Sequence, residues 1–434
     1  MNLTPYEQEM LAGKYGPVKQ KALENICLYA KALNVDELCE VSFSTMFIGA
    51  HGYLEACGKE DPMENFAVMN AMEANDGQPL QLDSFCKDCV CHTCVEAFDP
   101  EKAERLGISR EAWAKNEAYV KYCMDAGAIR TASCAPYLNG WIPLRGQHFV
   151  TTESSNVLLC NSLFGACGNP NGIEAVFWAS LCGRVPKYGK HIPENRLGTC
   201  LVQIDTPVET LEEWDLLGYI IGKKAPQSSV PVMTGQLVKP DLYKFKQFAA
   251  ACAVVSDIDM VHVVGLTPEA ITQEMAFGGK EPRAVLNITA DDFTWARKQL
   301  CCEDPGAVHY VTLGCPHASI YEIQQIAEYL RGKHVAPGVH LHIWTNYAIR
   351  ELAKLNGFAK IIDDAGADLM AAHCPYGIFE FPEVRDALLP AGGGLVADSI
   401  KQATDQPAMC APGVRTYFGD RERCIDAAVS GYWR

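Results

Sequence analysis

Three cysteines share a local sequence pattern that suits metal binding. They are Cys134 in SCAPY, Cys315 in GCPHA and Cys374 in HCPYG, and a proline follows each of them within two residues. Proline holds the residue before it in extended conformations and offers no N–H group, and some iron–sulfur proteins place a ligand cysteine directly before a proline. The pattern allows a three-cysteine site. Cys410 in MCAPG shares it, however, and loop thiols beside turn prolines are the alternative.

A second group of cysteines is much denser. The run FCKDCVCHTC places Cys86, Cys89, Cys91 and Cys94 within nine residues, with His92 among them. Four soft ligands this close together predict a second metal site, holding zinc or an iron–sulfur cluster. The single residue between the two CxxC pairs is unusual for a zinc ribbon, so the kind of metal stays open, and a distant residue can also complete the site.

The segment around Cys315 predicts how its thiol is positioned. Residues 308–313 are rich in β-favouring side chains and Gly314 ends them, whereas apolar residues from Ile320 to Leu330 recur at helical spacing. Ser319 and Glu322 form a capping box that predicts a helix beginning at Ile320. The free N–H groups of that helix would favour a thiolate at Cys315. A buried, inert cysteine is the alternative.

The composition is typical of a globular protein and excludes several function classes. The chain has 434 residues, 48% of them hydrophobic and 21% charged, and a net charge of −16. Such an acidic chain is not expected to bind nucleic acid or an anionic membrane surface. Without an apolar run of membrane-spanning length or a signal peptide, we expect a cytoplasmic protein. In that reducing compartment its 20 cysteines are expected to be buried or to bind metal.

Sequence segments with strand patterns and segments with helix patterns alternate along the second half of the chain. Residues 259–265, 284–289 and 339–344 read as strands, and residues 267–275, 290–300 and 346–357 as helices. Alternation of this kind predicts an α/β class with mostly parallel sheets in α/β/α layers, in which ligands gather at the carboxyl ends of strands. We predict two α/β regions, 1–230, with a Cys-rich insert at about 80–98, and 231–434, whose C-terminal segment returns to the active site. The Pro-, Gly- and Ser-rich residues 222–240 mark the boundary.

Longer motifs resemble the large, catalytic subunit of the aconitase X family. The resemblance runs through LTPYEQEMLAGKYG, SCAPYLNGWIPLRGQHFVTTESSNVLLCNSLFGA, VPKYGKHIPENR, LGCPHASIYEI and GFAKIIDDAGADLMAAHC. In that family three cysteines hold an iron–sulfur cluster, and they correspond here to Cys134, Cys315 and Cys374. The implied reaction is the elimination of water from a hydroxy-acid, and known members dehydrate cis-3-hydroxyproline or mevalonate 5-phosphate.

The resemblance also implies the residues of the pocket. Those expected to act in catalysis are His148, Glu153, Ser154, Ser155, Ser399 and Lys401, and those expected to bind substrate are Tyr137, Asn156, Asn161, Ser162 and His317. Each has an ordinary structural alternative, because Glu153 and the serines can cap a helix and His148 can be a core histidine.

Two departures and one missing segment qualify the resemblance. Where the family reads Gly-Ala-Arg-Thr-Asn-Arg-Glu-Gly, this chain reads GACGNPNG over residues 165–172, so Cys167 and Pro170 stand in place of arginines that would bind carboxylate or phosphate. The Cys-rich run lies outside the family pattern. The small swivelling domain of aconitase-like enzymes finds no counterpart in the chain, so a separate small subunit is the expected partner.

Two functions therefore stay open at the level of sequence. The first is an iron–sulfur hydro-lyase that acts on a small hydroxy-acid as the large subunit of a two-subunit aconitase X. The second is a non-catalytic or redox protein that keeps the aconitase X fold and binds a metal or cluster through its four-cysteine insert. The cluster cysteines and the ESSN segment favour the first function, and the two missing arginines favour the second.

Overall fold

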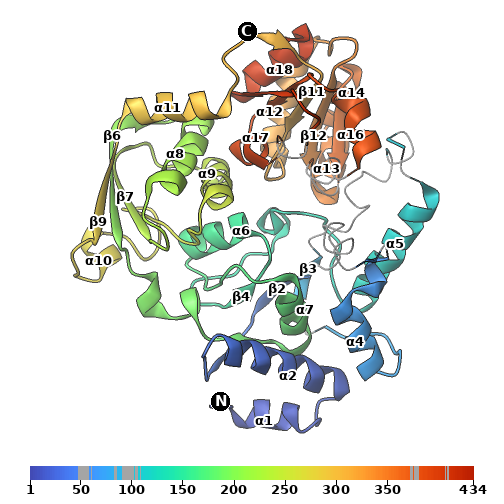
Figure 1. The fold of residues 1–434 in the computed structure, drawn as a ribbon, viewed down its shortest axis with the longest axis vertical. Helices are drawn as coiled ribbons and strands as arrows, with labels where there is room; N and C mark the ends of the chain where they lie inside the picture. The colour runs from blue at the N-terminus through green and yellow to red at the C-terminus, as the bar shows by residue number, and fades with distance from the viewer. Residues whose placement is uncertain are drawn as a thin grey trace.

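The computed structural model describes most of the chain. The described residues are 1–46, 58–59, 61–82, 86–89, 102, 106–107, 109–371, 375, 381–405, 407 and 410–434. They form three α/β regions that follow one another in sequence (Figure 1). Among these residues, none of the helices combines the length and the apolar composition that crossing a membrane requires.

The first region contains the N-terminal helices and a small sheet of order β3-β2-β4, in which both strand pairs are parallel. Its helices are α1 (Pro5–Leu11), α2 (Pro17–Ala32), α4 (Phe66–Ala74), α5 (Arg110–Asp125), α6 (Ser154–Leu159) and α7 (Ile173–Cys182), and its short helices are η1 (Pro62–Glu64), η2 (Pro136–Asn139), η3 (Cys160–Phe164), η4 (Gly189–His191) and η5 (Pro193–Arg196). Its strands are β1 (Leu38–Glu40), β2 (Phe43–Met46), β3 (Cys86–Cys89), β4 (Phe149–Val150) and β5 (Arg184–Pro186). Strands β1 and β5 pair antiparallel beside α2 and α7.

The second region is a parallel sheet of order β8-β7-β6-β9. Its elements are β6 (Cys200–Val208), α8 (Leu211–Lys224), β7 (Pro231–Leu237), α9 (Leu242–Val255), β8 (His262–Val263), α10 (Gln273–Phe277), β9 (Ala284–Ile288) and α11 (Ala290–Leu300). Successive residues of β6 enter different cores, because Val202 and Ile204 pack with α8 and α9, whereas Leu201 packs toward α10. The predicted boundary after residue 230 falls within this sheet, since β6 and β7 are neighbours in it.

The third region is a five-stranded parallel sheet of order β13-β12-β11-β14-β15. Its strands are β11 (Tyr310–Leu313), β12 (His340–Thr345), β13 (Asp368–Ala371), β14 (Gly394–Ala397) and β15 (Arg415–Phe418), and β10 (Gly306–Ala307) pairs with β16 (Tyr432–Trp433) beside it. Its helices are α12 (Ile320–Leu330), α13 (Tyr347–Leu355), α14 (Phe358–Asp364), α16 (Pro382–Leu388), α17 (Ile400–Asp405) and α18 (Arg421–Ser430). Val311 and Leu313 pack toward α12 and α18, and Tyr310 packs toward α16, so the sheet has a core on each face.

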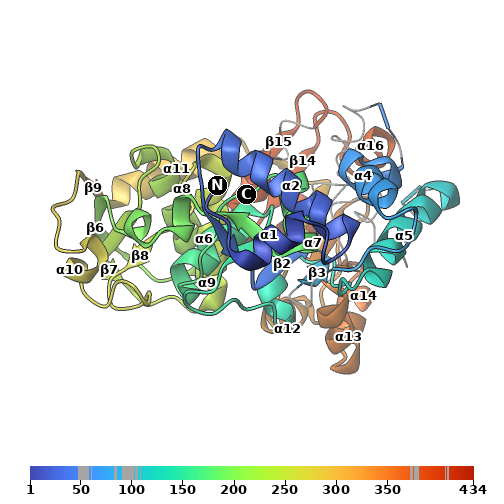
Figure 2. The same cartoon turned by 90° about the horizontal axis from the view of Figure 1, so that it is seen from below.

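The first region meets the other two near α6. In Figures 1 and 2 this helix lies beside α9 of the second region, and the two helices are in contact. Helix α17 of the third region also contacts α9. Side chains of α6, α9 and α17 therefore meet in one core, which contains Val157, Phe248 and Ile400.

Most of the elements expected from the sequence are present, and two are much shorter. The strand expected over 259–265 is only β8, and the helix expected over 267–275 begins at Gln273, with Thr272 as its N-cap. Thr267 explains the difference, because its Oγ1 accepts a hydrogen bond from the Val263 amide and donates one to the Val263 carbonyl. A threonine that bonds its local backbone in this way favours a turn over a helix.

Candidate functional site

Cys315 lies at the carboxyl end of β11, as the sequence predicts. It is buried and follows Gly314, whose φ of +87° suits glycine. A Cβ at position 314 would lie 2.4 Å from the carbonyl oxygen of Trp344, so only glycine lets the strand end this close to β12. The capping box is also as predicted, with the Ser319 side chain accepting from the Glu322 amide and α12 beginning at Ile320.

Cys134 approaches the same turn from the first region. The backbone N–H of His317 donates a hydrogen bond to the Cys134 Sγ over 3.4 Å. The His317 ring, which is buried, contacts the Ser133 hydroxyl with 3.3 Å between Nδ1 and Oγ. Two of the three predicted cluster cysteines thus come from segments that are distant in the sequence. The third, Cys374, lies outside the described residues.

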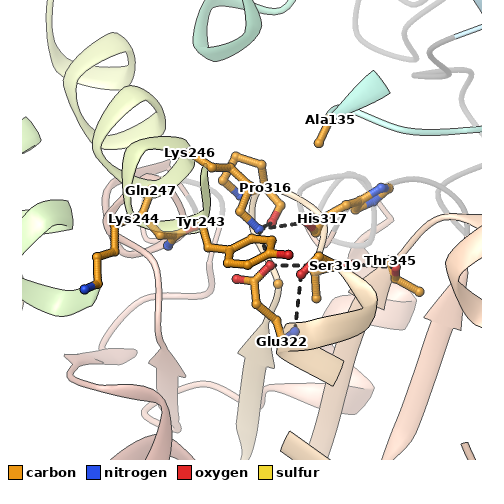
Figure 3. A network of polar contacts seen from close by, with 12 residues as sticks. Ala135, Tyr243, Lys244, Lys246, Gln247, Pro316, His317, Ser319, Glu322 and Thr345 are labelled. Atoms are coloured by element: carbon orange, nitrogen blue, oxygen red, sulfur yellow. Dashed lines mark hydrogen bonds and ion pairs between the residues drawn. The ribbon is translucent and has the colours of Figure 1, made fainter. Parts of the chain in front are cut away.

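A buried charge network supports the turn that carries Cys315 (Figure 3). Lys246 of α9 has no exposed side-chain surface, and its Nζ donates to the carbonyls of Pro316 and His317, at 3.0 and 2.9 Å. The same ammonium bonds Glu322 Oε2 at 2.8 Å. Every donor of this lysine therefore has a partner, and two of the three bonds fix the backbone directly after Cys315.

Arg421 extends this network to the next strand of the sheet. It donates to Glu322 Oε1 at 3.1 Å and to Asp398 Oδ2 at 2.9 Å, and the other oxygen of Asp398 accepts from the Gly314 amide at 3.4 Å. Burial alone would raise the pKa of Glu322, but Lys246 and Arg421 lower it to about 2. The glutamate therefore stays ionised, and the turn is held from both sides.

Glu153 and Lys401 form a second charged pair beside the cysteines. Glu153 precedes the first residue of α6 and is buried, and its Oε2 lies 3.5 Å from the Nζ of Lys401, which is 24% exposed. Burial alone would lower the pKa of Lys401, but the carboxylate of Glu153, and with it Cys315 and Cys134, raises it. The lysine is therefore a cation on which both cysteines act electrostatically.

The start of α17, which carries Lys401, is fixed by a buried carboxyl group. Asp215 of α8 accepts a hydrogen bond from the Ile400 amide, with 2.9 Å between N and Oδ2. Burial raises the pKa of Asp215 well above its usual range, which favours the neutral acid, and the group caps the start of α17. The neighbouring Ser399 is fully buried, and its Oγ has no hydrogen-bond partner among the described residues.

The remaining residues of the ESSN segment lie on α6. Ser154 begins the helix and is partly exposed, and Ser155 and Asn156 are buried. The Asn156 Oδ1 accepts from the Cys160 thiol at 3.3 Å, and its Nδ2 has no partner among the described residues. Tyr137 is also buried, and burial, together with the nearby Cys134, raises the pKa of its phenol.

Two other predicted pocket residues, Asn161 and Ser162, form hydrogen bonds with backbone groups of the protein. The Asn161 side chain bonds the backbone of Gly168 on both sides, at 2.8 and 2.9 Å, and the carbonyl of Asp259 at 2.9 Å. The Ser162 hydroxyl accepts from the Val261 amide at 2.9 Å. The bonds to Asp259 and Val261 connect the first region to the second. Their role in substrate binding remains a prediction.

His148 has partners different from those of Glu153. Its Nδ1 lies 3.0 Å from the Nδ1 of His191, whereas Glu153 contacts Lys401. Of the Cys-rich run, Cys86 and Cys89 lie in β3, at positions that pair with Ser44 and Met46 of β2. Cys91 and Cys94 lie outside the described residues, so the second metal site stays a prediction.

Three family models match the chain along nearly its whole length. Aconitase X first domain matches residues 1–194, Aconitase X second domain residues 198–298 and Aconitase X third domain residues 308–430. A phosphomevalonate dehydratase large subunit from Methanothermobacter thermautotrophicus is 32% identical over 93% of each chain. The chain belongs to the aconitase X family.

Other relatives agree with this assignment. A cis-3-hydroxy-L-proline dehydratase from Pseudomonas aeruginosa is 26% identical over 99% of this chain and 70% of its own length. The crystal structure of Thermococcus kodakaraensis aconitase X in its holo-form superposes with a TM-score of 0.77 at 25% identity, covering 99% of this chain and all of that one. The predicted family and the α/β class are confirmed, and the names of the relatives support the predicted enzyme class, a hydro-lyase.

Proposed function

We propose that this chain is the large subunit of an iron–sulfur-dependent dehydratase that removes water from a small hydroxy-carboxylic acid. The observation that carries the proposal is the meeting of Cys134 with the turn of Cys315, beside the Glu153–Lys401 pair. Thiolates are the usual ligands of iron–sulfur clusters. A redox scaffold would have no need of a carboxylate and an ammonium at the same place.

The donor set fits an iron–sulfur cluster. Cys134, Cys315 and, by prediction, Cys374 would hold it, and the kinship with the holo-form of an aconitase X supports this. When bound, such a cluster supplies a Lewis acid that helps a hydroxyl group to leave. All other functions in the reaction fall to side chains of this chain and of its partner.

Lys401 is suited to bind the carboxylate of the substrate. Its raised pKa keeps it protonated, so it acts as a fixed cation and cannot serve as a base. Negative charge grows on the substrate carboxylate when the neighbouring C–H bond is broken, and a preorganised cation stabilises that charge. Glu153, paired with this lysine, is the residue that we assign to accept the proton.

Two buried polar atoms are available for the substrate. The Ser399 Oγ and the Asn156 Nδ2 have no hydrogen-bond partner among the described residues. Buried polar groups nearly always have a partner, so a ligand with oxygen atoms would satisfy both. We assign these atoms, with Ser154, Ser155, Tyr137 and His317 around them, to the pocket that orients the hydroxy-acid.

The partner and the substrate class follow from the relatives. Several of them are named large subunits of phosphomevalonate dehydratase, which implies a small-subunit partner. We assign to that partner the swivelling domain that covers the pocket. Because Cys167 and Pro170 replace two arginines of the family pattern, we do not assign phosphomevalonate or hydroxyproline itself to this chain.

The test uses anaerobically purified chain together with the small subunit of the same organism. We expect iron and sulfide with visible absorbance, and dehydration of a member of a panel of hydroxy-acids that includes phosphomevalonate and cis-3-hydroxy-L-proline. Cys315→Ser should lose absorbance and activity together. Lys401→Met should keep its iron and lose activity by about 100-fold or more, the usual effect of removing one charge-stabilising group.

A buried cysteine of the first region provides the control. Cys182→Ala should keep iron and activity, since this thiol lies in a separate apolar core. The proposal fails if Cys315→Ser retains the iron of the parent. If Cys89→Ser removes all metal instead, the chain is a metal-binding scaffold.

A further inference from the structure

Cys39, His148 and His191 bring three metal-ligand atoms together at a place that the proposed proton transfer does not use. One ligand atom of each residue lies within 4.8 Å of those of the other two. Cys39 is in β1, His191 ends η4 and His148 directly precedes β4, so three separate segments supply the ligands. Cys39 and His191 are buried, with 7% and 2% of their surface exposed, and His148 is partly buried.

The two imidazole rings are arranged in a way that a cation would explain. Their Nδ1 atoms are 3.0 Å apart, while the Nε2 of His191 is buried and has no partner among the described residues. One hydrogen bond between the rings would leave the adjacent thiol unused. A shared cation uses all three residues.

The chemistry of the donors indicates which cation fits. One thiol and two imidazoles in a buried setting suit zinc, which takes nitrogen and sulfur ligands and leaves a fourth position for water or another residue. Cys167 lies beside the three ligands. Its backbone forms a parallel β-bridge with that of His148, and its thiol acts electrostatically on Cys39.

The guanidinium of Arg196, which acts electrostatically on both histidines, is neutralised. Its Nε donates to Glu269 Oε2 at 3.0 Å and its Nη2 to the Asn161 carbonyl at 3.0 Å. The charge of Arg196 is thus largely balanced by Glu269. Lys187, which acts on Cys39 and His148, is paired with Glu37.

We propose that Cys39, His148 and His191 form a zinc-class metal site that fastens β1 to the segments before β4 and after β5. This site is separate from the cysteines assigned to the iron–sulfur cluster and from the Cys-rich run. Its expected effect is on stability, because one ion would join three segments that lie far apart in the sequence.

The test measures zinc and iron per chain in the wild-type protein, in Cys39→Ala and in His191→Asn after equilibration with zinc. Each variant should bind one equivalent of zinc fewer than the wild type and keep the same iron content. Zinc at the Cys-rich run would be equal in all three proteins and cancels in the difference. Both variants should also lose the rise in melting temperature that zinc gives the wild type.

Cys182→Ala is the matched control, because Cys182 is a buried thiol of the same apolar core as Cys39. It should bind zinc like the wild type. The proposal is overturned if Cys39→Ala binds as much zinc as the wild type, if Cys182→Ala loses the same equivalent, or if the wild type takes up none. Should the variants fail to fold, X-ray absorption of zinc bound to Cys89→Ser, in which the Cys-rich run lacks one of its ligands, decides. A shell with more imidazole than sulfur supports the site, and a shell mostly of sulfur excludes it.

Discussion

Replacing Lys246 by methionine should loosen the turn that carries Cys315. The substitution removes a buried ammonium that bonds Glu322 and two backbone carbonyls. Breaking a buried ion pair by removing one partner costs about 3 to 5 kcal/mol. Arg421 still binds Glu322 at 3.1 Å and limits the loss, so we expect a cost of about 4 kcal/mol.

Hydrogen exchange of residues 310–330 is the appropriate assay for this cost. A chain built of three α/β regions need not unfold in a single step, so one global unfolding energy would average over the regions, whereas exchange reports the local opening energy of this segment. A cost of about 4 kcal/mol corresponds to exchange roughly a thousandfold faster in this segment. Adding Glu322→Gln should recover part of the loss, because the neutral amide keeps the helix cap without an unpaired charge.

Lys244→Met on the same helix is the control. This lysine is partly exposed, and its side chain points away from the turn in Figure 3. Lys244→Met should change the exchange rate of residues 310–330 by less than about threefold, since surface substitutions typically change stability by no more than about 0.5 kcal/mol. If Lys246→Met exchanges as slowly as Lys244→Met, the network does not hold the turn and our reasoning is wrong.

Three further predictions test the same region. The pKa of Glu322 is lowered from 4.5 to about 2, so its stabilising contribution is complete above about pH 4.5 and is lost as the pH falls toward 2. Between pH 5 and pH 3 the melting temperature of Glu322→Gln should therefore fall less than that of the wild type. Gly314→Ala should lower the melting temperature far more than Gly338→Ala, which shares a positive φ but has open space around its Cα; equal effects would show that the Trp344 carbonyl is not the constraint. Asp215→Asn should keep activity, because the buried group already acts as a neutral acceptor for the Ile400 amide. Asp215→Ala, which removes the acceptor, should reduce kcat. If Asp215→Asn lowers kcat more than Asp215→Ala does, the neutral state assigned to Asp215 is wrong.

The local parts of the site were predictable from the sequence. The strand before Cys315, the glycine that ends it and the capping box of α12 depend on residues within a few positions of one another. Short-range propensity and side-chain capping therefore sufficed. The family motifs then identified Glu153 and Lys401, which the fold brings to 3.5 Å.

The long-range contacts were not predictable in the same way. Lys246 and Glu322 are separated by 76 positions, and His148 and His191 by 43. Neither pair has a spacing that marks it. A signal for Lys246 existed, since a lysine inside the apolar run FKQFAAACAVV must either break the buried face or find a partner there. For His148 the resemblance suggested the catalytic pocket, and nothing in the sequence indicated a contact with His191.

The bond between the Cys134 thiol and the His317 amide limits how early in translation this part of the site can form. The two residues are 183 positions apart, so a nascent chain carries this thiol long before its counterpart has been translated. At about 5 to 20 residues per second the delay is on the order of 10 to 40 s. Delivery of iron and sulfide for the cluster that we propose would therefore belong to the last phase of synthesis or follow release from the ribosome.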